Sequence, residues 1–138
     1  MKPQSKSEYA VAVFSDDNNC AQSVLVPFGT EKGLSQSQCI QIASGFGGGI
    51  AMSGLTCGAV TGAIMALGLA GTGEGKSKEL TYEQSKELMQ MFEEKFGSIQ
   101  CKILTEPKQN DDTKHFCDKF VSEAASMVED ILKREMNG

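Results

Sequence analysis

The sequence predicts an all-α protein, a compact bundle of about five to six helices with a glycine-rich, uncharged central segment. Apolar residues recur at helical spacing in several segments, and neither a hairpin signal nor a sustained apolar/polar alternation indicates a sheet. A chain of 138 residues is long enough for one hydrophobic core and short for two. We therefore expect a single domain over residues 1–138, with its core in residues 19–132.

Three helices are expected in the N-terminal part of the chain. The first covers residues 7–14. Asn19 has the side chain of a helix cap and begins the second, which Pro27 is expected to end or kink. Residues 35–46 form a further amphipathic segment.

The central segment differs from the rest of the chain in charge and glycine content. Residues 33–73 contain no Asp, Glu, Lys or Arg, and 11 of the 15 glycines lie between Gly45 and Gly75. We expect this segment to form the core, with a helix over residues 56–70. Small residues recur there every four positions and would let another backbone approach closely. They are Gly54, Gly58, Gly62, Ala66 and Ala70.

Two longer amphipathic helices complete the bundle. One covers residues 77–96, where five apolar residues share a face and Gly97 ends the helix. The other covers residues 113–136. A short segment, 101–104, lies between them.

Charge and hydropathy exclude several kinds of partner. The formal net charge is −5, so nothing attracts phosphate backbones, and we expect no nucleic acid partner. Residues 50–71 are long enough to span a membrane, but they contain Ser, Thr and five glycines and lack basic flanks, so a membrane span is not expected. The polar residues 1–7 carry no secretion signal, which favours a cytoplasmic location.

The five cysteines are the residues most suited to chemistry. A reducing cytoplasm disfavours structural disulfides. Cys39 lies within an amphipathic segment and is expected to be a small core residue. The other four lie near predicted helix N-termini, where the helix dipole favours the thiolate and so activates both nucleophiles and metal ligands. These are Cys20, Cys57, Cys101 and Cys117.

Common cofactor motifs are absent from the sequence or incomplete. No C-x-x-C pair signals a zinc ribbon or a thioredoxin-type site, and the lack of C-x-x-C-H excludes covalent haem. Residues 70–77 match a relaxed phosphate loop but follow a helix-like segment instead of a strand, so no nucleotide is expected. His115, the single histidine, is expected on a solvated helix surface. On residue chemistry alone, scattered cysteines and a converging site both remain open.

Several short motifs occur in a specific order along most of the chain. They are Asn19-Cys20-Ala21-Gln22, Ser44-Gly45-Phe46-Gly47-Gly48-Gly49, Thr56-Cys57-Gly58-Ala59-Val60-Thr61-Gly62-Ala63, Phe96-Gly97-Ser98-Ile99 with Cys101, and Cys117. With this set the sequence resembles the C_GCAxxG_C_C family of redox-active proteins, named for four cysteines. The central hexad reads Cys-Gly-Ala-x-x-Gly, with its first two residues in the opposite order to the family label.

The resemblance implies that four cysteines are redox thiols that converge on one site, with Cys39 outside it. We call these four, Cys20, Cys57, Cys101 and Cys117, the family cysteines. Our main hypothesis is that they bind an iron–sulfur cluster or another thiolate-ligated metal and exchange electrons with a redox partner. Gly58 and Gly62 would then admit a neighbouring helix or the cluster.

Two alternatives have other chemistry. The first is a metal-free thiol-disulfide oxidoreductase or redox sensor in which pairs such as Cys101 and Cys117 cycle. The second is an interaction module whose thiols are structural. A homodimer would suit a small helical protein with a shared site, but no residue indicates one.

Overall fold

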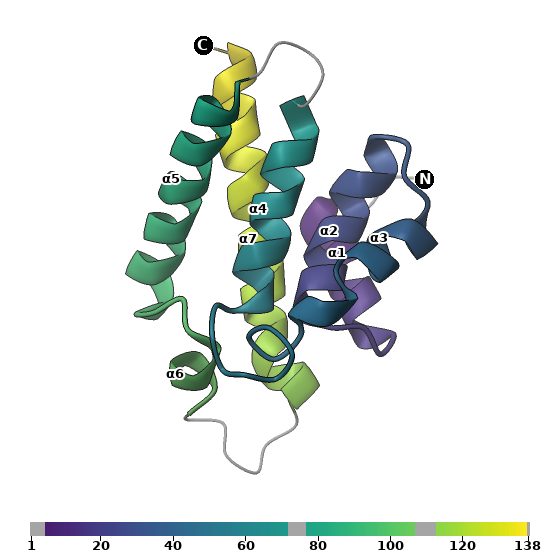
Figure 1. Ribbon diagram of the computed structural model, residues 1–138, viewed down its shortest axis with the longest axis vertical. Helices are drawn as coiled ribbons and strands as arrows, with labels where there is room; N and C mark the ends of the chain where they lie inside the picture. Colours follow the sequence, from purple (N-terminus) through teal and green to yellow (C-terminus); the bar gives the residue numbers. More distant parts are fainter. Residues whose placement is uncertain (1–4, 72–76, 107–112, 138) are drawn as a thin grey trace.

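The protein is a bundle of α-helices in the computed structural model, which describes residues 5–71, 77–106 and 113–137 (Figure 1). The all-α prediction is confirmed, with no strand in these ranges. The expected number of helices is slightly too low, because residues 101–105 form a helix of their own. The helices are α1 (Lys6–Ser15), α2 (Cys20–Glu31), α3 (Gln36–Ile42), the 3₁₀ turn η1 (Ser44–Phe46), α4 (Gly58–Gly71), α5 (Lys78–Phe96), α6 (Cys101–Thr105) and α7 (Thr113–Asn137).

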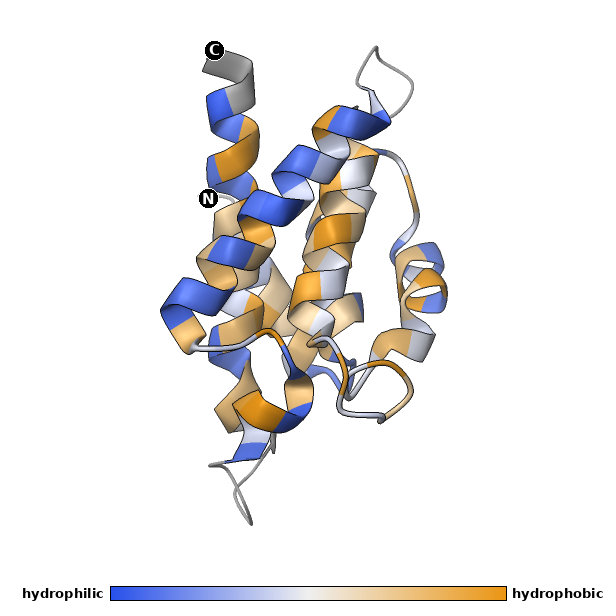
Figure 2. Ribbon diagram, turned by 60° about the vertical axis from the view of Figure 1, so that its left-hand side comes forward, coloured by the Kyte–Doolittle hydropathy of each residue, from blue (hydrophilic) through white to orange (hydrophobic). Residues whose placement is uncertain are grey.

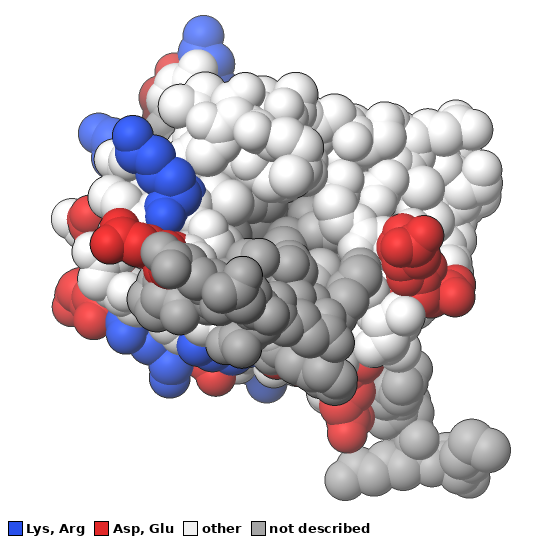
Figure 3. Space-filling model, turned by 90° about the horizontal axis from the view of Figure 1, so that it is seen from below, with Lys and Arg blue, Asp and Glu red and all other residues white. Residues whose placement is uncertain are grey.

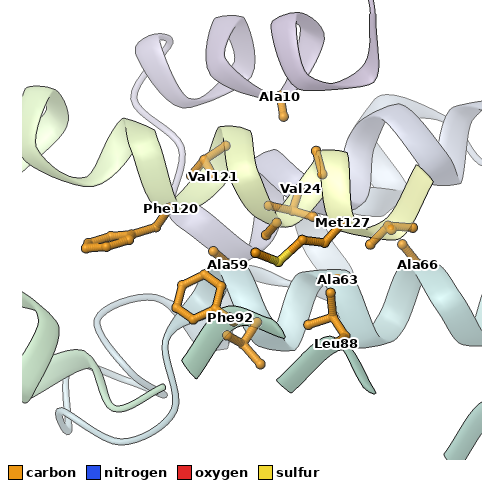
Figure 4. Packing of buried hydrophobic residues seen from close by; sticks show 14 of the residues in the cluster. Ala10, Val24, Ala59, Ala63, Ala66, Leu88, Phe92, Phe120, Val121 and Met127 are labelled. Atoms are coloured by element: carbon orange, nitrogen blue, oxygen red, sulfur yellow. The ribbon is translucent and has the colours of Figure 1, made fainter. Parts of the chain in front are cut away.

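Helix α4 lies between the two halves of the bundle (Figure 1). It packs against α2 on one side and against α5 and α7 on the other, while α1 packs on α2 and α7. The rings of Phe92 and Phe120 close the core near the start of α4, with centroids 5.9 Å apart (Figure 4). Hydrophilic residues of α5 lie on its outer face (Figure 2), as its amphipathic pattern predicts.

The glycines of α4 allow it to lie directly against α2. A Cβ atom added at Gly62 would lie 2.7 Å from the Ala21 carbonyl oxygen, and one at Gly58 would lie 2.9 Å from the Ala21 nitrogen. Real side chains do not approach backbone atoms so closely. The prediction that this face admits another backbone is therefore confirmed, and the neighbour is α2.

Helix α2 is longer than its sequence suggests. We expected Pro27 to end or kink the helix; the first of these is wrong, since the helix continues to Glu31, and the kink stays a prediction. An internal proline removes one backbone hydrogen bond and costs about 3 kcal/mol. Residues 21–29 are all buried, and α2 contacts α1, α3, α4 and α7. Burial of this apolar surface offsets the loss.

The central segment is only partly core. Helix α4 is buried, but the residues before it form a loop, in which Met52 is 83% and Leu55 54% exposed. From Gly48 to Met52 every residue has a positive φ, between 53° and 74°. The loop closes on itself, because the Leu55 N–H donates to the Gly49 carbonyl at 2.9 Å. The central segment therefore lacks charged residues both because α4 is buried and because the residues before it form a tight loop.

Two further predictions concern the same part of the chain. Across the three described ranges, no helix has the length and apolar character needed to cross a membrane. Residues 72–76, which hold most of the incomplete phosphate loop, lie outside the described residues.

Candidate functional site

The family cysteines meet at one end of the bundle, where four helices begin. Cys20 and Cys101 are the first residues of α2 and α6, Cys57 directly precedes α4, and Cys117 lies one turn into α7. All four line one cavity of about 540 Å³, called here the cysteine cavity. None of the cysteines is in a disulfide. The predicted positions at helix N-termini are confirmed.

The N-terminus of α2 is held by the predicted cap. The Asn19 side chain accepts a hydrogen bond from the Gln22 N–H at 2.8 Å, and the Gln22 side chain accepts one from the Asn19 N–H at 2.8 Å. This capping box satisfies donors that the helix itself leaves unpaired. It also fixes the position of Cys20, the residue that directly follows the cap.

Cys57 and Cys101 are brought together by backbone hydrogen bonds between two distant segments. The Cys57 N–H donates to the Ile99 carbonyl at 2.7 Å, and the Cys101 N–H donates to the Leu55 carbonyl at 2.6 Å. A Cβ at Gly49 would lie 2.7 Å from the Cys101 Cβ and 2.6 Å from the Leu55 nitrogen. Glycine at this positive-φ position therefore lets the loop pack on Cys101.

Cys20 is the centre of a group of three thiols. It is hydrogen-bonded to both Cys117 and Cys57. These hydrogen bonds, the one with Cys117 foremost, raise the pKa of Cys20 well above that of an ordinary thiol, and burial raises it further. Cys20 therefore keeps its proton at neutral pH. We call Cys20, Cys57 and Cys117 the thiol cluster.

Cys57 has the opposite shift. The hydrogen bond from Cys20 lowers the pKa of Cys57, and the backbone N–H groups of Ala59 and Val60 lower it further. Burial and the nearby Cys117 act against this but do not reverse it. The first turn of α4 thus stabilises a thiolate on Cys57, as the helix-dipole argument predicts.

The remaining cysteines separate as the sequence indicates. Cys39 is fully buried in a second apolar cluster, and burial raises its pKa, so its predicted core role is confirmed. Cys101 is half-buried and lines the cysteine cavity, and its carbonyl accepts a hydrogen bond from the Thr105 hydroxyl at 2.8 Å. Its predicted pairing with Cys117 stays a prediction.

Other cavity-lining residues were not found by sequence reasoning. Lys102 follows Cys101 directly in the sequence, and this adjacency could have indicated that it lines the cavity. Phe14 on α1 is next to no cysteine in the sequence, so no such signal marks it. Gly58 lines the cavity as well as touching α2, and the cofactor contact expected for Gly58 and Gly62 stays a prediction. Those missed are Phe14, Asp17, Asn18, Gly48, Met52, Lys102, Leu104, Thr105 and Phe120.

The thiols were tested for the geometry of a metal site. In the described ranges, no group of three or more His, Cys, Asp or Glu side chains is arranged to hold a metal ion. The side chain of His115 lies outside the described residues. Metal ligation by the family cysteines therefore stays a prediction.

Comparison with known proteins agrees with the order of the motifs. One family, described as "Putative redox-active protein (C_GCAxxG_C_C)", matches residues 18–131. The chain belongs to this family. The matched region includes all the cysteines that line the cavity, and it confirms the C_GCAxxG_C_C resemblance seen in the sequence. No curated protein and no solved structure matches the chain.

The hydrogen bond from Cys20 to Cys57 predicts a shift in a pH profile. In this C_GCAxxG_C_C protein, Cys20→Ala removes the donor that contributes most to the low pKa of Cys57. Because only the thiolate is alkylated, the rate of Cys57 alkylation by iodoacetamide should reach its plateau at a higher pH in the variant.

The measurement is mass spectrometry of the tryptic peptide 33–76, in a Cys39→Ala background so that Cys57 is its single thiol. A profile that does not move, or that moves to lower pH, would contradict the assigned donor.

Proposed function

We propose that this C_GCAxxG_C_C protein is a thiol-based redox protein in which Cys57 is the attacking thiolate and Cys20 the resolving thiol. The observation that carries the proposal is that Cys20, Cys57 and Cys117 line one cavity and lie close enough together to shift one another's pKa values. A low-pKa thiolate beside a protonated thiol is the arrangement that thiol-disulfide exchange requires. A reducing compartment such as the cytoplasm would keep the cluster in its dithiol form.

The reaction has two steps. The Cys57 thiolate attacks one sulfur of a disulfide, forming a mixed disulfide and releasing the first thiolate, which takes a proton from solvent. Cys20 then gives up its proton and attacks the Cys57 sulfur, and the second substrate thiol leaves with that proton. The substrate gains two electrons, and the protein keeps a Cys20–Cys57 disulfide.

Cys117 extends the site beyond a single pair. It is hydrogen-bonded to Cys20 and lies close enough to Cys57 to affect its pKa. In the proposed cycle it competes with Cys57 as the partner of Cys20. The two disulfides then interconvert by exchange inside the cavity.

A second candidate is favoured by the cavity itself. Four cysteines around one cavity are the ligand set of common iron–sulfur clusters, and they would hold such a cluster or another thiolate-bound metal. The bound group would supply one-electron transfer. This candidate requires the thiols to rearrange, because the described side chains form no metal-holding group as they lie.

Disulfide mapping tests the proposal. A lysine lies between each two consecutive family cysteines, so trypsin places every one in a separate peptide; these are Lys32, Lys76 and Lys102. After mild anaerobic oxidation we expect the peptides of Cys20 and Cys57, or of Cys20 and Cys117, to be linked. Random mixed disulfides would contradict the proposal.

Metal content distinguishes the second candidate. The protein is purified without oxygen, and its absorption spectrum and bound iron are measured before and after reconstitution with iron and sulfide. Stoichiometric iron with charge-transfer absorption, lost in Cys57→Ala, would favour the cluster. A colourless protein that binds no iron favours the thiol reaction.

A further inference from the structure

The cysteine cavity restricts the disulfides that can reach Cys57, an inference that rests on the proposed function. We propose that it admits small aliphatic disulfides without negative charge and discriminates against anionic ones and against disulfides held in folded proteins. The same two-step exchange then takes place at its floor: the substrate disulfide becomes two thiols, and the protein becomes the Cys20–Cys57 disulfide.

The first argument is burial. Cys57 is 4% and Cys117 6% exposed, so a substrate sulfur must enter the cavity to touch either. The volume of about 540 Å³ lies within the range of about 300–1,000 Å³ that holds small organic ligands. A disulfide in a folded protein is flanked by backbone on both sides, which hinders entry of its sulfur into a cavity of this size.

The second argument is the chemistry of the walls. Apolar side chains from four different parts of the chain line the cavity; they are Phe14, Met52, Leu104 and Phe120. Among the described lining residues only Asp17 and Lys102 are charged, and they have opposite signs. The Cys57 thiolate of the proposed function adds a further negative charge, so an anionic substrate loses hydration without a net attraction in return.

The surroundings of the cavity agree with this selectivity. Figure 3 views the bundle from the end at which α4 and α6 begin, and most of the described surface there carries no charge. Met52, which lines the cavity, is highly exposed, and Leu55 and Ile103 nearby are about half exposed. Among the described residues of this face, a small molecule thus meets few ionic groups on approach.

The test compares three disulfides of similar size and different charge. They are bis(2-hydroxyethyl) disulfide, which is neutral, cystamine, a dication, and dithiodiglycolate, a dianion. Each rate of reaction with the reduced protein is divided by the rate of the same disulfide with 1-thioglycerol, a neutral thiol that differs from all three leaving thiols, which removes intrinsic reactivity. We expect the neutral reagent to be favoured about 10-fold over the dianion, the dication to react no more slowly than the neutral reagent, and insulin disulfides to react more slowly than the neutral reagent.

A cavity-filling variant tests the route. Thr105→Phe places a ring in the cavity and should slow the neutral disulfide about 10-fold, while oxidation by hydrogen peroxide, which is close to water in size, stays unchanged. Met52→Phe at the exposed rim gives the same test without touching the core. Ile42→Phe, exposed and outside the cavity lining, is the matched control.

The outcomes separate the two proposals. Equal normalised rates for the three reagents, or neutral-disulfide rates unchanged in both filling variants, would overturn the selectivity alone. If neither the disulfides nor peroxide yields an intramolecular link within the thiol cluster, the proposed function fails and the selectivity with it.

Discussion

Replacing Cys57 with alanine is expected to slow the reaction with bis(2-hydroxyethyl) disulfide on the order of 100-fold at neutral pH. Only a thiolate attacks a disulfide, and the pKa of Cys57 is lowered whereas that of Cys20 is raised well above its ordinary value. Cys20, which remains in the variant, holds its proton more tightly. The measurement is the loss of titratable thiols with time under anaerobic conditions.

The matched control is Cys39→Ala. Cys39 is fully buried in the second apolar cluster, away from the cysteine cavity, so its removal should cost about 1 kcal/mol of stability and leave the exchange rate unchanged. If Cys57→Ala reacts at the rate of the unmodified protein, Cys57 is not the attacking group.

The largest expected effect on stability is at Gly62. A Cβ there would lie 2.7 Å from the carbonyl oxygen and 3.0 Å from the Cα of Ala21. These are backbone atoms that cannot turn aside, so Gly62→Val must push α4 away from α2. We expect a loss of about 3 kcal/mol in the free energy of unfolding, or roughly 10 °C in Tm, measured by urea and thermal denaturation.

Gly68→Ala on the same helix is the control. The nearest atom to a Cβ at Gly68 is the Thr81 Cγ2 at 3.9 Å, an ordinary van der Waals distance. Alanine should therefore gain about 0.5–1 kcal/mol from its higher helix propensity. Equal stability of Gly62→Val and the unmodified protein would mean that the two helices are not in close contact.

Local signals in the sequence predicted much of the fold. The cap at Asn19, the stop at Gly97 and the apolar spacing of α5 each depend on neighbouring residues, so they were readable without tertiary structure. Pro27 shows the limit of such signals. Its local preference is to end α2, but the burial of residues 21–29 against other helices outweighs that preference.

The loop before α4 shows a second limit. Low charge and many glycines suggested a buried segment, and these features also suit a tight left-handed loop that leaves Met52 exposed. Composition does not distinguish these two uses of glycine, because both depend on a missing Cβ. The close contact of Gly49 with Cys101 in the folded protein shows that glycine here serves the tight loop.

By itself the sequence determined the helical class, the family, and the choice of four cysteines over Cys39, because each depends on spacing, order or position at a helix terminus. Tertiary structure alone decided that Cys20 contacts Cys57 and Cys117, and which of them holds its proton. The reason is physical: a pKa depends on the hydrogen bonds and burial of a thiol. At this site those come from α2, α4 and α7, whose cysteines are far apart in the chain and meet only in the folded bundle.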